Sequence, residues 1–265
     1  MCRLAAYIGQ VPVTVAALLY EPAHSLEHAA YAPREMVPGH VNVDGTGVAW
    51  WPDRKQKPIR YVTASPPWSD PNLPHLAWRL EGVTVLAAVR SATPGMSYGP
   101  DSVAPFIGGH LAGVHNGWIG GFKGGVGRQL TNLLTDERFG RLGAITDSLV
   151  LFSLVAQAVE EQPDVSLSEA IVTTIETVSK TVTAAGKQAT LNLVIAVSDR
   201  IVAVRTSVDF EANSLYVRES EEGVWLASEP LDEAEGWRTI PKVSLAELTT
   251  TGFSVRDLDH PGAPT

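Results

Sequence analysis

Two long amphipathic helices are predicted in the middle of the chain, between two halves rich in strands and turns. Residues 147–162 and 166–185 repeat apolar side chains at helical spacing, and a capping box of Ser166 and Glu169 marks the start of the second helix. Strand-like runs lie on both sides of this pair, at residues 2–9, 83–89, 110–114 and 191–197. Amphipathic helices have to cover a sheet or one another, so we predict one α/β domain with strand-rich ends and central helices.

Composition narrows the class of protein. Of the 265 residues, 45% are hydrophobic and 18% are charged, which is typical of a globular chain. The net charge of −9 opposes binding to nucleic acid or anionic lipid. No apolar run approaches the roughly 18–20 residues that span a bilayer. We therefore expect a cytoplasmic protein without nucleic-acid or membrane partners, and assembly into a homo-oligomer stays open.

The single cysteine is the second residue of the chain, Cys2. One cysteine forms no internal disulfide and no cysteine-rich metal site, which fits a reducing compartment. Removal of Met1 would give Cys2 a free α-amine with a pKa of about 7.7–8.0, so that the nucleophile and its general base share one residue. The alternative is a small apolar residue in a buried first strand, because free cysteine is among the most buried residue types.

Three other positions carry groups that suit catalysis or binding. His115-Asn116-Gly117 follows a predicted strand and opens a glycine-rich loop, where a side-chain amide and a backbone N–H suit an oxyanion hole; a plain Asn-Gly turn is the alternative. Arg90 ends another strand, where it would bind a substrate carboxylate or form a surface salt bridge. Asp147 begins the first long helix, as a helix cap or as the counter-ion of a substrate ammonium.

Three further patterns are not expected to carry chemistry. Residues 95–99 match the Gly-x-Ser-x-Gly nucleophile elbow, but no helix is predicted to open after Ser97. The glycine-rich residues 120–127 lack the ending of a phosphate-binding loop. His24 and His28 have helical spacing, but no third metal ligand is evident. We therefore predict neither a metal site nor a cofactor.

Taken together, these residues occur in an order and context that resemble the class II glutamine amidotransferases of the N-terminal-nucleophile hydrolase superfamily. A finer resemblance is to the branch that removes the γ-glutamyl group from γ-glutamyl-hercynylcysteine sulfoxide in ergothioneine biosynthesis. The motifs that carry it run from residue 1 to about residue 241: Met1-Cys2-Arg3, Tyr31-Ala32-Pro33-Arg34, residues 42–47, residues 89–95, Ala104-Pro105-Phe106, Thr146-Asp147-Ser148, Leu191-Asn192 and residues 226–230.

The resemblance implies a four-layer αββα sandwich, of mixed α/β (α+β) class, and a covalent mechanism. In this mechanism Cys2 attacks the γ-carbonyl carbon and its own α-amine handles the protons. The side-chain amide of Asn116 and the backbone N–H of Gly117 hold the tetrahedral oxyanion, a contribution of about 10²–10³ in rate per donor. The products are glutamate and an amine.

The resemblance also implies how the γ-glutamyl group is bound. Arg90 holds its α-carboxylate and Asp147 its α-ammonium, and Thr93 lines the same pocket. Many members of the family have Trp after the arginine and His after the threonine, where this chain has Ser91 and Pro94. The loop over the substrate is therefore expected to differ from that of enzymes that use free glutamine.

We expect a single glutamine amidotransferase domain over residues 1–258 and a disordered tail over residues 259–265. Because no acceptor domain is evident, the expected reaction is hydrolysis of a small γ-glutamyl amide, with γ-glutamyl-hercynylcysteine sulfoxide as the leading substrate. The alternatives are a glutaminase subunit that feeds ammonia to a partner synthase, and a γ-glutamyl hydrolase of glutathione-type thiols. A non-catalytic binding protein on the same fold is the alternative from another class.

Overall fold

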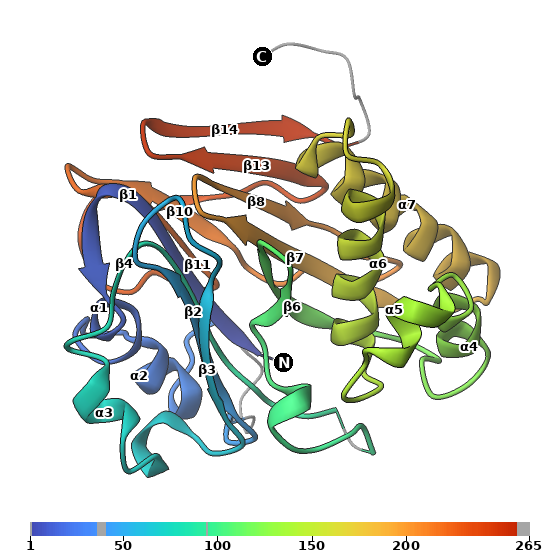
Figure 1. The fold of residues 1–265 in the computed structure, drawn as a ribbon, viewed down its shortest axis with the longest axis horizontal. Coiled ribbons are helices and arrows are strands. Elements are labelled where there is room, and N and C mark those ends of the chain that lie inside the picture. The colour runs from blue at the N-terminus through green and yellow to red at the C-terminus, as the bar shows by residue number, and fades with distance from the viewer. Residues whose placement is uncertain (1, 36–40, 94, 259–265) are drawn as a thin grey trace.

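A computed structural model describes residues 2–35, 41–93 and 95–258 (Figure 1). Two large antiparallel sheets face each other, and helices cover the outer face of each sheet. This architecture confirms the predicted four-layer αββα sandwich. The predicted tail, residues 259–265, lies outside the described residues. Within the described ranges, no helix is both long enough and apolar enough to cross a membrane.

The first sheet has the strand order β12-β10-β11-β1-β4-β2-β3. Its strands are β1 (Arg3–Thr14), β2 (Thr46–Trp51), β3 (Ile59–Thr63), β4 (Glu81–Val89), β10 (Tyr216–Glu219), β11 (Gly223–Ala227) and β12 (Arg238–Thr239). The first strand of the chain is therefore central, paired with β4 on one side and β11 on the other. The outer face of this first sheet is covered by α1 (Ala16–Leu19), α2 (Leu26–Tyr31) and α3 (Leu73–Leu76).

The second sheet has the strand order β14-β13-β8-β7-β6-β5, with β9 also paired to β7. Its strands are β5 (Phe106–Gly108), β6 (Leu111–Ile119), β7 (Ala189–Val197), β8 (Arg200–Arg205), β9 (Ser207–Val208), β13 (Ser244–Thr249) and β14 (Gly252–Asp257). The helices beside it are α4 (Gly125–Thr131), α5 (Asp136–Gly140), α6 (Asp147–Glu161) and α7 (Leu167–Ala184). Two short 3-10 helices, η1 (Pro67–Ser69) and η2 (Pro100–Ser102), lie in connections.

Side chains alternate between the two faces of each sheet, as the pleat of a strand requires. In β1, Leu4, Ala6 and Ile8 lie in the core between the sheets, whereas Ala5 and Tyr7 pack against the helices outside. The same core receives residues of even number from the facing strands: Leu86 and Ala88 of β4, Ala112 and Val114 of β6, and Val194 and Ala196 of β7. Even-numbered side chains at the ends of these strands therefore point into the space between the sheets.

Most predicted elements are present, and two have different limits. The strand predicted over residues 2–9 continues to Thr14, because Val13 and Thr14 pair with Gly82 and Glu81 of β4. The strand expected over residues 110–114 continues to Ile119, paired throughout with β7. Both errors come from pairing partners that are far away in the sequence.

Candidate active site

The start of β1 lies beside the end of β4. Arg3 is opposite Val89 in the antiparallel register, so the next step along both strands brings Cys2 toward Arg90. Cys2 is partly exposed. Its side chain follows the alternation of Leu4 and Ala6, and that of Arg90 follows Ala88, so both face the space between the sheets.

The residue after Cys2 anchors this end of β1. The Arg3 side chain is buried and forms an ion pair of 3.1 Å with the buried carboxylate of Glu229. Burial lowers the pKa of Arg3, and the charge of Glu229 acts in the opposite direction. Leu4 and Ser228 add two hydrogen bonds, one between backbone atoms from Ser228 N to Leu4 O (2.9 Å) and one from Leu4 N to the side-chain oxygen Ser228 Oγ (3.2 Å). The position of Cys2 is thus fixed by its neighbours.

Arg90 has one terminal nitrogen bound and one free. Its backbone is held by Gly45 O and Asp44 N, and its side chain is only 8% exposed. Nη2 donates to Ser97 O at 2.8 Å, while Nη1 is buried without a hydrogen-bond partner in the described ranges. An unpaired buried guanidinium N–H is costly, and a bound carboxylate would satisfy it.

Asn116 and Gly117 lie inside β6, where the sequence predicted a loop. Their partners in the register are Asn192 and Leu191 of β7. The Asn-Gly pair favours a turn locally, but eight pairs with β7 override this preference. The prediction of a loop is therefore wrong, and the two residues are held by a rigid strand. His115, by contrast, faces the helix layer and contacts Ser148 of α6.

The Asn116 side chain is completely buried and faces the space between the sheets. Its carbonyl oxygen Oδ1 accepts a bond of 3.3 Å from Asn213 Nδ2. Its amide nitrogen Nδ2 has no partner among the described residues. A buried amide donor without a partner, at the end of the sandwich where Cys2 and Arg90 also lie, is the group that an oxyanion hole requires.

The backbone N–H of Gly117 points away from β7. Successive amides along a strand point to opposite sides, and Trp118 N donates toward β7, to Thr190 Oγ1 (3.2 Å). Ile119 N donates to Asp147 Oδ2 (3.0 Å), on the opposite side. The N–H of Gly117 therefore shares the edge of β6 that Asp147 reaches.

Asp147 is the first residue of α6 and is 5% exposed. Thr146, and not Asp147, is the N-cap, since its side chain accepts from Leu149 N. The Asp147 carboxylate accepts from Ile119 N (3.0 Å) and from Ser148 N (2.8 Å). It thus lies two residues along the edge of β6 from Gly117, a step of about 6.8 Å.

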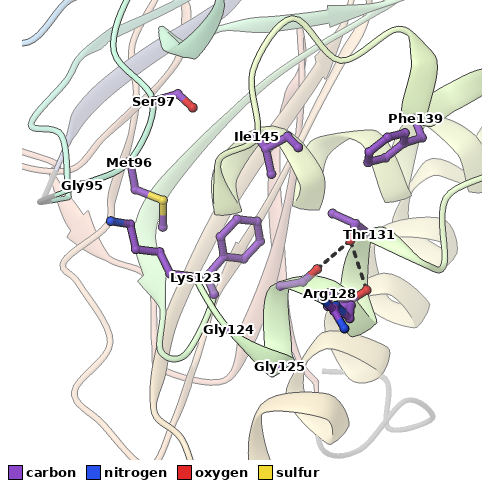
Figure 2. Close-up of a pocket in the computed structure, with 12 residues that line it drawn as sticks. Gly95, Met96, Ser97, Lys123, Gly124, Gly125, Arg128, Thr131, Phe139 and Ile145 are labelled. Carbon is purple, nitrogen blue, oxygen red and sulfur yellow. Dashed lines mark hydrogen bonds between the residues drawn. The ribbon is translucent and has the colours of Figure 1, made fainter.

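A cavity of about 610 Å³, shown in Figure 2, is lined by Ser97, whose backbone oxygen accepts from Arg90, and by Ile145, two residues before Asp147. It lies between the loop after Arg90, the segment after β6 and the residue Ile145 just before α6. Lys123 and Arg128 line it together with the aromatic rings of Phe122 and Phe139. The side chain of Thr93 is exposed in the loop after β4 and is not part of the lining.

The γ-glutamyl-hercynylcysteine sulfoxide hydrolase of Mycobacterium tuberculosis (strain CDC 1551 / Oshkosh) is 30% identical over 264 residues, covering 100% of both chains. A class-II glutamine aminotransferase domain protein from Silicibacter pomeroyi superposes with a TM-score of 0.70 at 25% identity, covering 97% of this chain and 99% of the other. The chain belongs to the class II glutamine amidotransferase family.

Two further similar proteins support this assignment. The enzyme of the same name from Mycolicibacterium smegmatis is 30% identical over 251 residues, covering 94% of this chain and 96% of the relative. A probable glutamine amidotransferase of Saccharomyces cerevisiae is 27% identical, and the match covers 94% of this chain and 82% of the relative. No family model matches the chain. These relatives are hydrolases and glutamine amidotransferases, so the prediction of an amidohydrolase of this class is confirmed.

Within the amidotransferase fold, the predicted site residues fall into three groups. The structure brings Cys2, Arg90 and Asn116 to one end of the space between the sheets, because Asn213 contacts Asn116, the adjacent Ser214 bonds to Ser228, and Ser228 bonds to Leu4 at the start of β1. It places Gly117 and Asp147 along the adjoining edge of β6. Thr93 lies in the loop after β4, three residues from Arg90, and its side chain is exposed.

Sequence reasoning gave no role to two asparagines beside Asn116, the buried Asn192 and the partly buried Asn213. Asn192 interrupts the apolar run of β7 with a polar side chain that is 0% exposed, and this interruption was a usable signal. Asn213 lies in an irregular segment, and no local pattern marks it. In the described part of the chain, no group of three or more His, Cys, Asp and Glu could hold a metal ion.

Proposed function

We propose that this amidotransferase hydrolyses a γ-glutamyl amide with Cys2 as the N-terminal nucleophile, and that residues 1–258 form its single catalytic domain. The observation that carries the proposal is a pair of buried donors, Arg90 Nη1 and Asn116 Nδ2, that have no partner among the described residues and lie at the end of the sandwich where β1 begins. Buried polar groups are rarely left unpaired, and those that are often await a ligand.

Binding uses the two ends of the glutamyl group. Arg90 Nη1 would receive the α-carboxylate, and the Asp147 carboxylate would balance the α-ammonium. The γ-carbonyl then lies toward Asn116 Nδ2 and the outward N–H of Gly117. A glutamyl chain carries its charges and its γ-carbonyl at opposite ends, which matches the separation of Asp147 from Gly117 along β6.

Removal of Met1, which lies outside the described residues, gives Cys2 its free α-amine. The amine takes the thiol proton as sulfur attacks the γ-carbonyl carbon, and the two donors hold the oxyanion. Collapse breaks the C–N bond, the α-ammonium protonates the leaving amine, and a glutamyl-thioester remains. Water, deprotonated by the α-amine, hydrolyses the thioester to glutamate and restores the thiol.

The leaving amine would occupy the cavity between the loop after Arg90 and the segment after β6 (Figure 2). The substrate that we propose is γ-glutamyl-hercynylcysteine sulfoxide, the substrate in the name of two relatives at 30% identity. Its leaving half carries two carboxylates, an imidazole ring and a trimethylammonium group. Lys123 and Arg128 supply positive charge in the cavity, and Phe122 and Phe139 supply aromatic faces.

The experiment is an intact-mass measurement before and after incubation with 6-diazo-5-oxo-norleucine, an electrophilic glutamine mimic, together with assays of glutamate release. We expect loss of Met1 and one adduct, mapped to Cys2. Cys2→Ala should take no adduct and lose at least about 10⁴-fold in kcat, the scale on which removal of a nucleophile acts. A retained Met1 with no adduct and no turnover would exclude this function and favour the binding protein.

A further inference from the structure

We infer that Asn213 is a positioning residue that sets the amide orientation of Asn116, and with it the polarity of the oxyanion hole. The inference deepens the proposed function and rests on it. It concerns three buried or partly buried side chains, Asn116, Asn192 and Asn213, which we call the asparagine cluster.

The hydrogen bonds of the cluster admit only one orientation of the Asn213 amide. One atom of that amide lies 2.9 Å from the backbone oxygen of Asn116. A backbone oxygen only accepts, so the atom facing it must be the donor Nδ2. The same Nδ2 lies 3.3 Å from the Asn116 side chain, which must therefore present Oδ1 to it. As a result, Asn116 turns Nδ2 to the opposite side, where no described residue is its partner.

The same argument fixes the amide orientation of Asn192, the register partner of Asn116 on β7. Its side chain contacts the backbone oxygens of Asn213 (2.9 Å) and Ser214 (3.4 Å), so the contacting atom is Nδ2. Its Oδ1 is then left buried without a partner in the described ranges. The two paired strands thus present one free donor and one free acceptor side by side.

Asn213 is itself held from two directions. Arg205 of β8, 9% exposed, donates from Nε to the Asn213 backbone oxygen at 2.8 Å. The next residue, Ser214, donates from Oγ to Ser228 O at 2.7 Å, and Ser228 pairs with Leu4, two residues from Cys2. The segment that orients Asn116 is therefore tied to the start of β1, where the nucleophile lies.

The test compares Asn213→Asp with Asn213→Ala in steady-state kinetics. Asp has the shape of Asn but places an acceptor opposite Asn116, which should turn its amide over and expose Oδ1 to the oxyanion. We expect kcat to fall about 10²–10³-fold for Asn213→Asp, with KM within about threefold of wild type. Asn213→Ala should lose only about two- to tenfold, since a freely rotating amide still samples the competent orientation.

A larger loss of kcat for Asn213→Asp than for Asn213→Ala distinguishes a positioning role from a purely structural one. A packing role predicts that Ala, which leaves a void, is at least as harmful as the isosteric Asp. Asn72→Asp makes the same change on an exposed residue at the start of α3, outside the site, and should leave kcat unchanged. Equal losses in the two Asn213 variants, or an effect confined to KM, would overturn the inference.

Thermal unfolding of each variant shows whether it folds. If the Asn213→Asp protein does not fold, the inference is tested instead by a double-mutant cycle of Asn116→Ala and Asn213→Ala. Asn213→Ala should then cause no further loss of kcat in the Asn116→Ala background, and additive losses of kcat would contradict the inference. A wild-type protein without Cys2-dependent turnover would instead reject the proposed function, whatever Asn213 does.

Discussion

His115 is held in one neutral tautomer between β6 and α6. Its Nε2 lies 2.9 Å from Thr190 O, which only accepts, so Nε2 carries the hydrogen. Its Nδ1 then accepts from Ser148 Oγ at 2.9 Å. Burial lowers the pKa of His115, although the charge of Asp147 and the Thr190 carbonyl act in the opposite direction. His115 is therefore a structural support for its neighbour Asn116.

This environment predicts a loss of stability in mild acid. Below an unfolded pKa of about 6.5, the unfolded chain binds a proton that the native His115 resists, so stability is present above that pH and falls below it. The fall from this group is up to about 1.4 kcal/mol per pH unit, until the lowered native pKa is reached. Urea unfolding of wild type and of His115→Gln at a series of pH values below about 6.5 measures this loss of stability. Parallel pH curves for the two proteins would contradict the expectation.

At the scale of elements, local signals predicted the helices well. The capping box of Ser166 and Glu169 is present at the start of α7, with both of its hydrogen bonds. The apolar spacing gave α6 and α7 to within about one residue, and the strand predicted over residues 191–197 is present as β7. Capping, periodicity and tight turns depend on residues close in sequence, and a sequence shows these directly.

The site was predictable only in its residue types. Cys2, Arg90 and Asn116 follow from the chemistry of their side chains and from the resemblance, and the structure brings them to one end. That Asn116 and Gly117 lie within β6 depends on pairing with β7, more than 70 residues later. The contact of Asn213 with Asn116 spans 97 residues through an irregular segment. Such contacts leave no periodic trace in the chain.

The close pairing of β6 with β7 predicts that Gly117 cannot be enlarged. A Cβ on Gly117 would overlap Thr190 O and His115 Nε2. Gly117→Ala should therefore destabilise the protein by about 1–3 kcal/mol, as the strands separate to admit the methyl group. Gly140→Ala, at the end of α5 with open space around its Cβ position, should remain within about 1 kcal/mol of wild type. Denaturant unfolding measures both, and equal stabilities would contradict the overlap.

At the scale of the whole molecule, both sheets contribute to the cavity beside the site. The loop of Gly95 and Ser97 follows β4 of the first sheet, and Lys123 follows β6 of the second (Figure 2). Lys123 Nζ lies against Gly95, so this side chain bridges the two loops. Lys123 and Arg128 form no ion pair within the residues that the structure describes. A cavity with unpaired cations favours a leaving amine that bears a carboxylate.

Lys123 should therefore select among leaving amines by charge. Lys123→Ala is expected to raise KM for γ-glutamylglutamate about two- to tenfold, a modest effect because the ammonium is exposed to solvent and screened. KM for γ-glutamylethylamide, whose leaving half is uncharged, should not change. Lys187→Ala removes an exposed lysine near Gly121, outside the cavity lining, and should alter neither constant. Equal changes for the two substrates would show that Lys123 supports the loops and does not read the charge of the leaving amine.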